Sequence, residues 1–219
     1  MELYKKSYSQ SGEDMIVDYI FNAKGVTYPS YLDVGANEPQ KISNTYYFYE
    51  KGCNGINIEP NPFLFNKLNK IRPKDINLNI GLGKDEKVID FYVMNSNTMS
   101  TFSKEEADKL CNTYSFEIVD VIKIPTKDVN NISDTYFNGD YPDYITIDVE
   151  GLDYEVLRTF DFKRNGANVI CVETIEYAEG FNGKKDFKII EFLKENGYLI
   201  YADTYINTIF VRNEWLRGL

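Results

Sequence analysis

The sequence contains two short apolar runs that each end in a polar turn, Tyr31-Leu-Asp-Val-Gly-Ala-Asn37 and Gly55-Ile-Asn-Ile-Glu-Pro-Asn61. Asp33 and Gly35 close the first run, and Glu59 closes the second. A Rossmann-like βαβ unit binds a nucleoside with this arrangement, because the glycine lets the backbone approach the ligand and the second acid accepts hydrogen bonds from the ribose hydroxyls. The two runs therefore predict an α/β domain that binds a nucleoside.

The glycine content of the first turn separates the candidate cofactors. A dinucleotide fingerprint needs three glycines so that a pyrophosphate can sit on a helix N-terminus, but only Gly35 is in place. Ala36, Asn37 and Glu38 follow it, and the carboxylate of Glu38 would repel a pyrophosphate. A nucleoside cofactor without phosphate fits better, which indicates S-adenosylmethionine, and no P-loop spacing is present. The alternative is a tight strand-to-helix turn with a solvated Glu59.

The composition is that of one soluble globular domain, residues 1–219, with 43% hydrophobic and 26% charged residues. The net charge of −10 argues against a nucleic-acid backbone or an anionic membrane surface as partner. No stretch approaches the roughly 18 apolar residues of a membrane span, and no apolar signal core follows the first residues. These features predict a cytoplasmic protein with no nucleic-acid or membrane partner.

Histidine is absent from the sequence. Its absence excludes a histidine base, a histidine metal ligand and a Ser-His-Asp triad, so acid–base or metal chemistry falls to Asp, Glu, Asn, Tyr, Lys or Cys. The cysteines are scattered and match neither a disulfide framework nor a zinc site; they are Cys53, Cys111 and Cys171.

Periodicity and turn residues predict alternating helices and strands. Helices are expected over residues 9–22, 43–51, 62–71, 104–113, 153–160 and 186–196. Ser11 is the expected N-cap of the first helix, and Ser43 or Asn44 that of the second. Strands are expected over residues 31–34, 55–59, 76–80, 87–94, 117–125, 144–149, 168–174, 198–203 and 208–212, and residues 95–101 are expected to form a loop.

This order of elements predicts a doubly wound α/β fold. The alternation favours a parallel sheet, while the short turn between the last two strands forces them to pair antiparallel. A mostly parallel, seven-stranded sheet with an antiparallel C-terminal hairpin is typical of class I methyltransferases, whereas dinucleotide dehydrogenases have six parallel strands. We expect a Rossmann-like core over residues 28–219, with residues 1–27 as an N-terminal helical cover.

Four motifs in order resemble the FkbM family of S-adenosylmethionine-dependent methyltransferases. They are Ser9-Gln-Ser-Gly-Glu-Asp14, Leu32-Asp-Val-Gly-Ala-Asn37, Gly55-Ile-Asn-Ile-Glu-Pro-Asn61 and Ile147-Asp-Val-Glu-Gly151. The resemblance covers residues 8 to 212, nearly the whole chain. It implies an O-methyltransferase that acts on a hydroxyl of a sugar or natural product, and the acceptor varies widely within the family. The implied partner is therefore a small molecule, a carbohydrate or a glycosylated metabolite.

The expected cofactor residues lie where strands end, because ligands of a doubly wound sheet bind beyond the carboxyl ends of the strands. We expect the methionine part near the first turn, the ribose at the end of the second strand and the adenine beside the third. The corresponding residues are Asp33, Gly35, Ala36 and Asn37, then Glu59, Pro60 and Asn61, then Ile80 and Gly81. Alternatively, Asp33 caps its turn and Asn61 caps the helix over residues 62–71.

The expected catalytic residues are carboxylates, because a sugar hydroxyl must lose its proton to a base or a metal. Asp148, Glu150 and Glu173 are the candidate bases, and Asp148 and Glu173 could also hold Mg²⁺, Ca²⁺ or Mn²⁺, which prefer oxygen ligands. Gln10, Glu13 and Asp14 of the N-terminal cover are expected beside the substrate. Alternatively, Glu150 begins a helix, and Glu13 and Asp14 complement a helix dipole.

Two other functions compete with methyl transfer. The missing second and third glycines and the antiparallel terminal hairpin argue against a nicotinamide-linked Rossmann oxidoreductase. A non-catalytic nucleoside-binding module with the same fold would not need Asp33, Glu59, Asp148 and Glu173 together. A protein acceptor stays open, while the acidity of the chain disfavours nucleic acid. Residues 95–117 are expected to shape the acceptor pocket.

Overall fold

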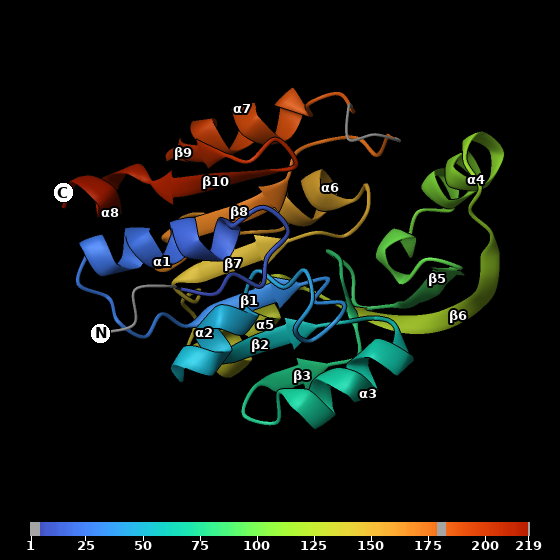
Figure 1. The fold of residues 1–219 in the computed structure, drawn as a ribbon, viewed down its shortest axis with the longest axis horizontal. Helices are drawn as coiled ribbons and strands as arrows, with labels where there is room; N and C mark the ends of the chain where they lie inside the picture. The colour runs from blue at the N-terminus through green and yellow to red at the C-terminus, as the bar shows by residue number, and fades with distance from the viewer. Residues whose placement is uncertain (1–4, 179–182, 219) are drawn as a thin grey trace.

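The computed structural model describes residues 5–178 and 183–218, which form an α/β fold with two sheets (Figure 1). The strands are β1 Tyr31–Val34, β2 Gly55–Ile58, β3 Ile76–Leu78, β4 Gly81–Leu82, β5 Val88–Met94, β6 Ile118–Lys127, β7 Tyr144–Ile147, β8 Val169–Glu173, β9 Tyr198–Asp203 and β10 Asn207–Arg212. The helices are α1 Glu13–Ala23, α2 Tyr46–Lys51, α3 Pro62–Ile71, the 3-10 helix η1 Asn97–Met99, α4 Lys104–Thr113, α5 Val129–Tyr136, α6 Asp153–Leu157, α7 Phe187–Glu195 and α8 Asn213–Arg217.

The main sheet has seven strands in the order β3-β2-β1-β7-β8-β10-β9. The pairs from β3 to β8 are parallel, and β10 lies antiparallel between β8 and β9. In the centre, Tyr31 of β1 faces Gly55 on one side and Tyr144 on the other. The expected mostly parallel sheet with an antiparallel C-terminal hairpin is therefore confirmed, and the fold is that of a class I methyltransferase.

Helices cover both faces of this sheet, so its central strands are buried throughout. Leu32, Ile145 and Ile170 belong to a core that also takes side chains from α5, α6 and α7. Tyr31 and Tyr144 point to the opposite face, where they pack with side chains of α1, α2 and α8. Successive side chains of each central strand thus point alternately into one core and into the other.

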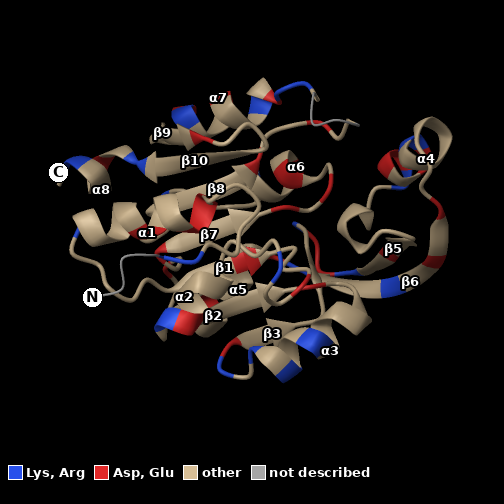
Figure 2. Ribbon diagram, in the orientation of Figure 1, with Lys and Arg blue, Asp and Glu red and all other residues tan. Residues whose placement is uncertain are grey.

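A second, three-stranded sheet of order β4-β6-β5 stands beyond the carboxyl ends of the parallel strands (Figure 1). β5 and β6 pair antiparallel, and β4 pairs in parallel with the end of β6. Met94 and Met99 pack here with Ala107 and Leu110 of α4. Asp and Glu residues gather on the facing side, in the loops beside α6 (Figure 2). The small sheet and these loops therefore face one another across the end of the main sheet.

Several local predictions need correction. α1 is capped by Gly12 and not by Ser11, whose N–H donates to the Glu13 carboxylate at 2.8 Å. α2 is capped by Thr45, although Ser43 Oγ still accepts the Tyr46 N–H at 3.1 Å. The strand expected over residues 76–80 ends as β3 at Leu78, and a separate short strand, β4, begins at Gly81. Residues 97–99 of the expected loop form η1, and α5 and α8 were not predicted.

No helix within residues 5–178 and 183–218 combines the length and the apolar character needed to cross a bilayer.

Candidate active site

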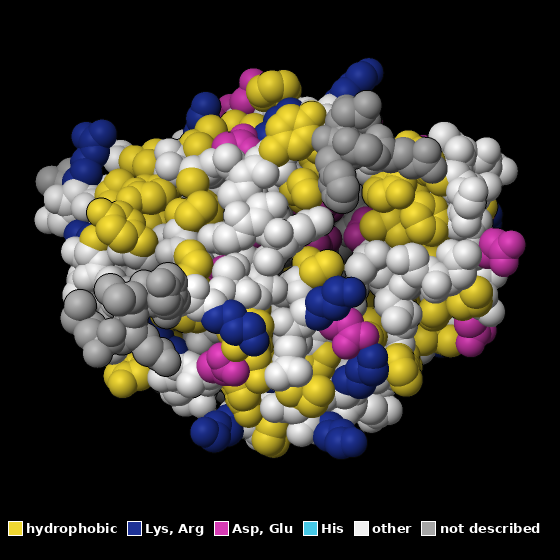
Figure 3. All heavy atoms as spheres, in the orientation of Figure 1, with side chains coloured by type: hydrophobic (Ala, Val, Ile, Leu, Met, Phe, Trp, Pro, Cys, Tyr) yellow, Lys and Arg dark blue, Asp and Glu magenta, His cyan; other side chains and the backbone are white. Residues whose placement is uncertain are grey.

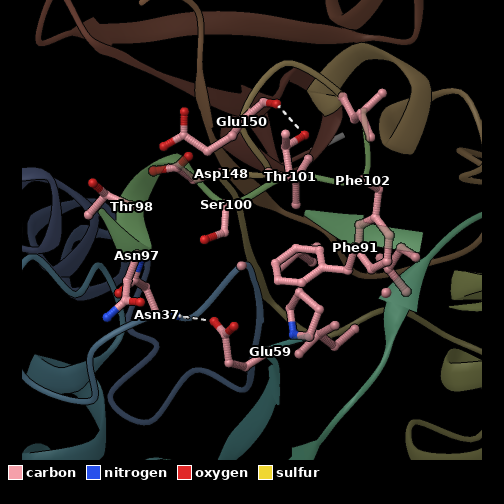
Figure 4. A pocket seen from close by; sticks show the side chains of 18 of the residues that line it. Asn37, Glu59, Phe91, Asn97, Thr98, Ser100, Thr101, Phe102, Asp148 and Glu150 are labelled. Carbon is pink, nitrogen blue, oxygen red and sulfur yellow. Dashed lines mark hydrogen bonds between the residues drawn. The ribbon is translucent and has the colours of Figure 1, made fainter. Parts of the chain in front are cut away.

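A cavity opens at the carboxyl ends of β1, β2 and β7, on the side covered by the small sheet. It encloses about 1030 Å³ of space between protein atoms, its open mouth included. Figure 3 shows acidic side chains inside a hollow on this face of the molecule, and Figure 4 shows the cavity from close by. Of the residues predicted from the sequence, the cavity is lined by Gly35, Asn37, Glu59, Pro60, Gly81, Asp148 and Glu150.

The turn after β1 is wedged between β2 and β7. Gly35 has φ +83°, and a Cβ atom on it would lie 1.9 Å from the carbonyl oxygen of Asp148. The N–H groups of Gly35 and Ala36 both donate to the Ile58 carbonyl, at 3.0 and 3.1 Å. Only glycine satisfies both the left-handed backbone and the close approach. Gly35 therefore contributes only backbone atoms to the cavity wall.

Glu59 connects the two motifs that indicated the fold. One carboxylate oxygen accepts the N–H of Asn37 at 2.7 Å (Figure 4). The other accepts the N–H of Asn61 at 2.8 Å. Its side chain is buried yet borders the cavity. Burial raises the pKa of Glu59 to about 7, against the effect of the two amide hydrogen bonds. Each oxygen keeps a lone pair with which it can accept a hydroxyl from a ligand.

Four predicted cofactor residues do not line the cavity: Asp33, Ala36, Asn61 and Ile80. Asp33 instead accepts the Thr45 hydroxyl at 2.5 Å and lies 3.9 Å from the guanidinium of Arg72. Arg72 is fully buried and bonds to Asp75 at 2.8 Å, so Asp33 belongs to a buried ionic network beneath the turn. Asn61 caps α3 by accepting the Phe63 N–H at 3.0 Å, as the structural alternative predicts.

The residues expected in the N-terminal cover also lie away from the cavity lining. Glu13 is buried and accepts hydrogen bonds from the Thr204 hydroxyl at 2.7 Å and from Asn207 at 3.1 Å. Asp14 accepts from the hydroxyls of Ser7 and Ser9, at 2.6 and 2.8 Å. The two acids thus fasten the N-terminal segment and the β9–β10 turn. Gln10, which lies between them and Tyr8 in the chain, does not reach the cavity either.

Three carboxylates meet at the other end of the cavity. Asp148, Glu150 and Glu173 each place an oxygen within 4.8 Å of the others. Asp148 and Glu150 line the first cavity, while Glu150 and Glu173 line a second one toward α6 and α7. Glu150 has φ +52°, and its carbonyl accepts the Thr101 hydroxyl at 3.0 Å (Figure 4). A residue of the small sheet region therefore holds the loop that carries Glu150.

The surroundings of this cluster resist negative charge. Although Asp148 faces the cavity, the loss of bulk water and repulsion from Asp33 raise its pKa to about 6. Desolvation, followed by repulsion from Asp148 and Glu173, raises the pKa of Glu150 well above its usual range. Desolvation and repulsion from Asp148 and Asp153 raise that of Glu173 to about 10. Such a cluster can take up a proton, or its oxygens can bind a hard cation.

The sequence motifs missed one wall of the cavity. It comes from residues 81–102, and the lining residues are Leu82, Phe91, Asn97, Thr98, Ser100, Thr101 and Phe102. The rings of Phe91 and Phe102 lie 4.8 Å apart, and a Cβ atom on Gly81 would lie 2.5 Å from the Phe102 ring. An apolar wall of this kind suits a flat base such as adenine. The sequence had indicated this wall in two ways: by the alternation of the strand over residues 87–94, and by the expectation that residues 95–117 shape the acceptor pocket.

The family model of the methyltransferase FkbM domain matches residues 33–200. The chain belongs to the FkbM methyltransferase family. This confirms the resemblance drawn from the four motifs, makes S-adenosylmethionine the cofactor, and sets aside the nicotinamide-linked alternative. No curated protein matches the chain by sequence.

Several solved structures are similar to this FkbM protein. A TehB-like S-adenosylmethionine-dependent methyltransferase from Corynebacterium glutamicum is 11% identical with a TM-score of 0.44, covering 92% of this chain and 87% of that one. The 1,6-didemethyltoxoflavin-N1-methyltransferase of Burkholderia thailandensis is 8% identical with a TM-score of 0.44, covering 92% and 77%. A putative O-methyltransferase from Klebsiella pneumoniae is 7% identical with a TM-score of 0.45, covering 97% and 84%. At this similarity the structures carry no argument about the acceptor.

The cavity of the FkbM protein fits its cofactor. Gly35 lines the cavity and has no side chain, so a ligand there can meet its backbone atoms. A buried carboxylate with spare lone pairs stands at the end of β2, and an apolar wall containing Phe91 and Phe102 stands opposite (Figure 4). The carboxylate suits the ribose hydroxyls, and the apolar wall suits the adenine.

Proposed function

We propose that this protein is an O-methyltransferase that acts on a hydroxyl of a carbohydrate or glycosylated metabolite. The observation that carries the proposal is the cluster of Asp148, Glu150 and Glu173 at the edge of the cofactor cavity. A hydroxyl is a poor nucleophile until its proton is removed, and this cluster, of which Asp148 and Glu150 line the cavity, can remove it. An amine or thiol acceptor would have less need of such a cluster.

The cofactor residues have separate roles in this proposal. S-adenosylmethionine supplies a methyl group that is already activated for transfer. Glu59 accepts hydrogen bonds from the ribose hydroxyls, and the Phe91 and Phe102 side packs on the adenine. The bare backbone at Gly35 lets the methionine part lie close to β1 and thus near Asp148. Holding the acceptor oxygen in line with the methyl group accounts for much of the acceleration expected of such a site.

Asp148 is the proposed base, because it faces the cavity and its pKa, raised to about 6, lies below that of Glu173, which is raised to about 10. Near neutral pH Asp148 is ionised while Glu173 retains its proton, so the Asp148 carboxylate can accept the hydroxyl proton. A divalent cation bound by all three carboxylates would serve the same end by favouring the alkoxide. Oxygen ligands at this spacing suit Mg²⁺, Ca²⁺ or Mn²⁺, and the role of a cation is tested below.

The acceptor is proposed to be a small molecule and not nucleic acid. The net charge is −10, and the lining of the two cavities carries the acids Glu38, Glu59, Asp148, Glu150 and Glu173 among others. A phosphate backbone would be repelled from such a surface. A neutral polyol loses nothing to this repulsion and can donate hydroxyl hydrogen bonds to the carboxylates.

The test is methyl transfer to a panel of neutral glycosides, phenols and amines, with isotopically labelled methyl groups and identification of the methylated atom. We expect transfer to a hydroxyl, and a loss of about 100-fold or more in kcat for Asp148→Asn with unchanged binding of S-adenosylhomocysteine. Asp85→Asn, which changes an exposed acid of a loop, is the matched control and should keep full activity. Methylation of nitrogen alone, or full activity of Asp148→Asn, would overturn the proposal.

Repeating the assay with EDTA and then with added Mg²⁺, Ca²⁺ or Mn²⁺ separates a proton-accepting cluster from a cation site. Activity that survives EDTA assigns the proton to Asp148. Activity that is lost and returns with one cation assigns the cluster to that cation, and Glu173→Gln should then weaken activation by the metal.

A further inference from the structure

One cation lines the cofactor cavity among the residues that the structure describes, and it is Lys41. The other charged side chains in the lining are the acids Glu38, Glu59, Asp148 and Glu150. Lys41 lies in the loop between β1 and α2, six residues after the glycine turn, and its side chain is exposed at the cavity. A single positive charge thus stands among four carboxyl groups.

Lys41 makes no hydrogen bond or ion pair with any part of the chain that the structure describes. Lys67, by contrast, donates to Glu38 at 2.6 Å. It thereby neutralises the lining acid that is nearest to Lys41 in the amino-acid sequence. The ammonium of Lys41 is therefore free to bind an anion that enters the cavity. An ordinary surface lysine would also lack a partner, so the argument for a binding role depends on how the loop holds Lys41 at the cavity.

The loop that carries Lys41 is fixed on both sides. The next residue, Ile42, has φ +55°, a left-handed conformation that a β-branched side chain adopts only when its surroundings enforce it. Ser43 is buried and donates its N–H to the Tyr8 carbonyl at 2.9 Å. Gln40 donates its side-chain amide to the Tyr46 hydroxyl at 2.5 Å. Strained backbone held this firmly is common where a chain clamps a ligand.

The ligand itself supplies the matching charge. The methionine end of S-adenosylmethionine carries a carboxylate, whereas the adenosine end carries none. The ammonium of the same methionine end is attracted to the ionised Asp148, whereas the carboxylate is repelled by that acid unless a cation compensates it. Charge-assisted hydrogen bonds to such a cation are the strong ones. The methionine end is expected near the turn that follows β1, on the same segment as Lys41.

We propose that Lys41 binds the carboxylate of the cofactor's methionine end and so helps the cavity to distinguish the intact cofactor from its adenosine part. The inference rests on the cofactor placement in the proposed function. It makes Lys41 a binding residue that acts through charge, without a part in the chemical step.

The test compares two ligands by isothermal titration calorimetry. S-adenosylhomocysteine contains the carboxylate, and 5′-methylthioadenosine keeps the adenosine and the sulfur but lacks the amino-acid end. For Lys41→Gln we expect about a tenfold loss of affinity for the first ligand and no change for the second. Lys41→Arg keeps the charge and should bind both ligands as the wild type does. Lys70→Gln, at an exposed position of α3 outside the lining, is the matched control.

A second readout is the salt dependence of binding. Added NaCl should weaken binding of S-adenosylhomocysteine to the wild type more than to Lys41→Gln, because salt screens an exposed charge pair. The inference is overturned if Lys41→Gln binds both ligands normally or loses both equally. If the wild type binds neither ligand, the cofactor placement itself is wrong, and the role of Lys41 falls with it. Wild-type binding of both ligands with no effect of Lys41→Gln would leave the proposed function standing.

Discussion

At the scale of single residues, Glu59 has two tasks. Its carboxylate joins the turn after β1 to the start of α3 through the N–H groups of Asn37 and Asn61. It also borders the cavity, where the proposal assigns it to the ribose. Because burial raises its pKa to about 7, a large fraction of the carboxyl is protonated at pH 6. Hydroxyl groups that donate to it favour the ionised form.

Cofactor binding should therefore depend on pH through Glu59. As pH rises from 6 to about 7.5, affinity for S-adenosylhomocysteine should increase by roughly tenfold and then level off, because below pH 7 binding must first release a proton. Calorimetry in two buffers of different ionisation enthalpy measures that proton. Glu59→Gln should bind weakly at every pH, with no proton release. An affinity of the wild type that is constant over this range would contradict the ribose role.

At the scale of elements, the site depends on three strands that end together. The turn after β1 is bonded to the end of β2 through the Ile58 carbonyl and lies against the carbonyl of Asp148 after β7. The small sheet closes the cavity from the other side, and Thr101 connects it to the loop of Glu150. A change that separates any two of these elements should open the cofactor cavity.

Gly35→Ala tests this junction. The new Cβ atom would collide with the Asp148 carbonyl and oppose the left-handed φ, so we expect a loss of about 3 kcal/mol in the free energy of unfolding and no detectable binding of S-adenosylhomocysteine. Gly197→Ala is a matched control, because Gly197 has φ +87° with no atom within 4 Å of a Cβ atom. It should lose only about 1–2 kcal/mol and keep its affinity. Chemical denaturation measures the free energy of unfolding, and calorimetry measures the affinity for S-adenosylhomocysteine. Equal affinity of the two variants would contradict the proposed role of the junction at Gly35.

At the scale of the whole molecule, acidic residues are concentrated where the strands end, and that arrangement costs stability. The folded protein raises the pKa of Glu173 to about 10, by desolvation and by repulsion from Asp148 and Asp153. Between the usual pKa of a glutamate and this value, the folded state binds more protons than the unfolded chain. Stability contributed by the protonated group is therefore complete at low pH and is lost as pH rises.

Glu173→Gln should remove this cost. In the presence of EDTA, its melting temperature should equal that of the wild type near pH 4.5 and exceed it by about 3–6 °C at pH 8, where about 1–2 kcal/mol is recovered. The control is Glu195→Gln at an exposed position of α7. Its melting temperature should differ from that of the wild type by the same amount at every pH. Thermal scans between pH 4.5 and 8 measure the difference. A variant that melts below the wild type at pH 8 would mean that favourable charge surrounds Glu173.

The features that depend on neighbours in the chain could be predicted from the amino-acid sequence. Alternating apolar runs, a glycine in the turn at Gly35 and the short link between the last two strands were sufficient for the mostly parallel sheet and its antiparallel end. The same rules placed Asp148, Glu150 and Glu173 at strand ends, which lie along one edge of a parallel sheet. These predictions succeeded because each rests on local backbone geometry that the sequence encodes directly.

Which side chains share a cavity could not be predicted in this way, because it depends on the packing of distant segments. Asp33 lies in the strand that precedes Gly35, but its carboxylate joins the network of Arg72. Arg72 follows α3 and is distant in the sequence, so only the packing of the elements brings the two side chains together. Phe91 and Phe102 reach the cavity because the small sheet folds back over the main one. Lys41 stands at the cavity for the same kind of reason. Contacts between distant segments depend on how the elements pack, and no spacing within one segment encodes that.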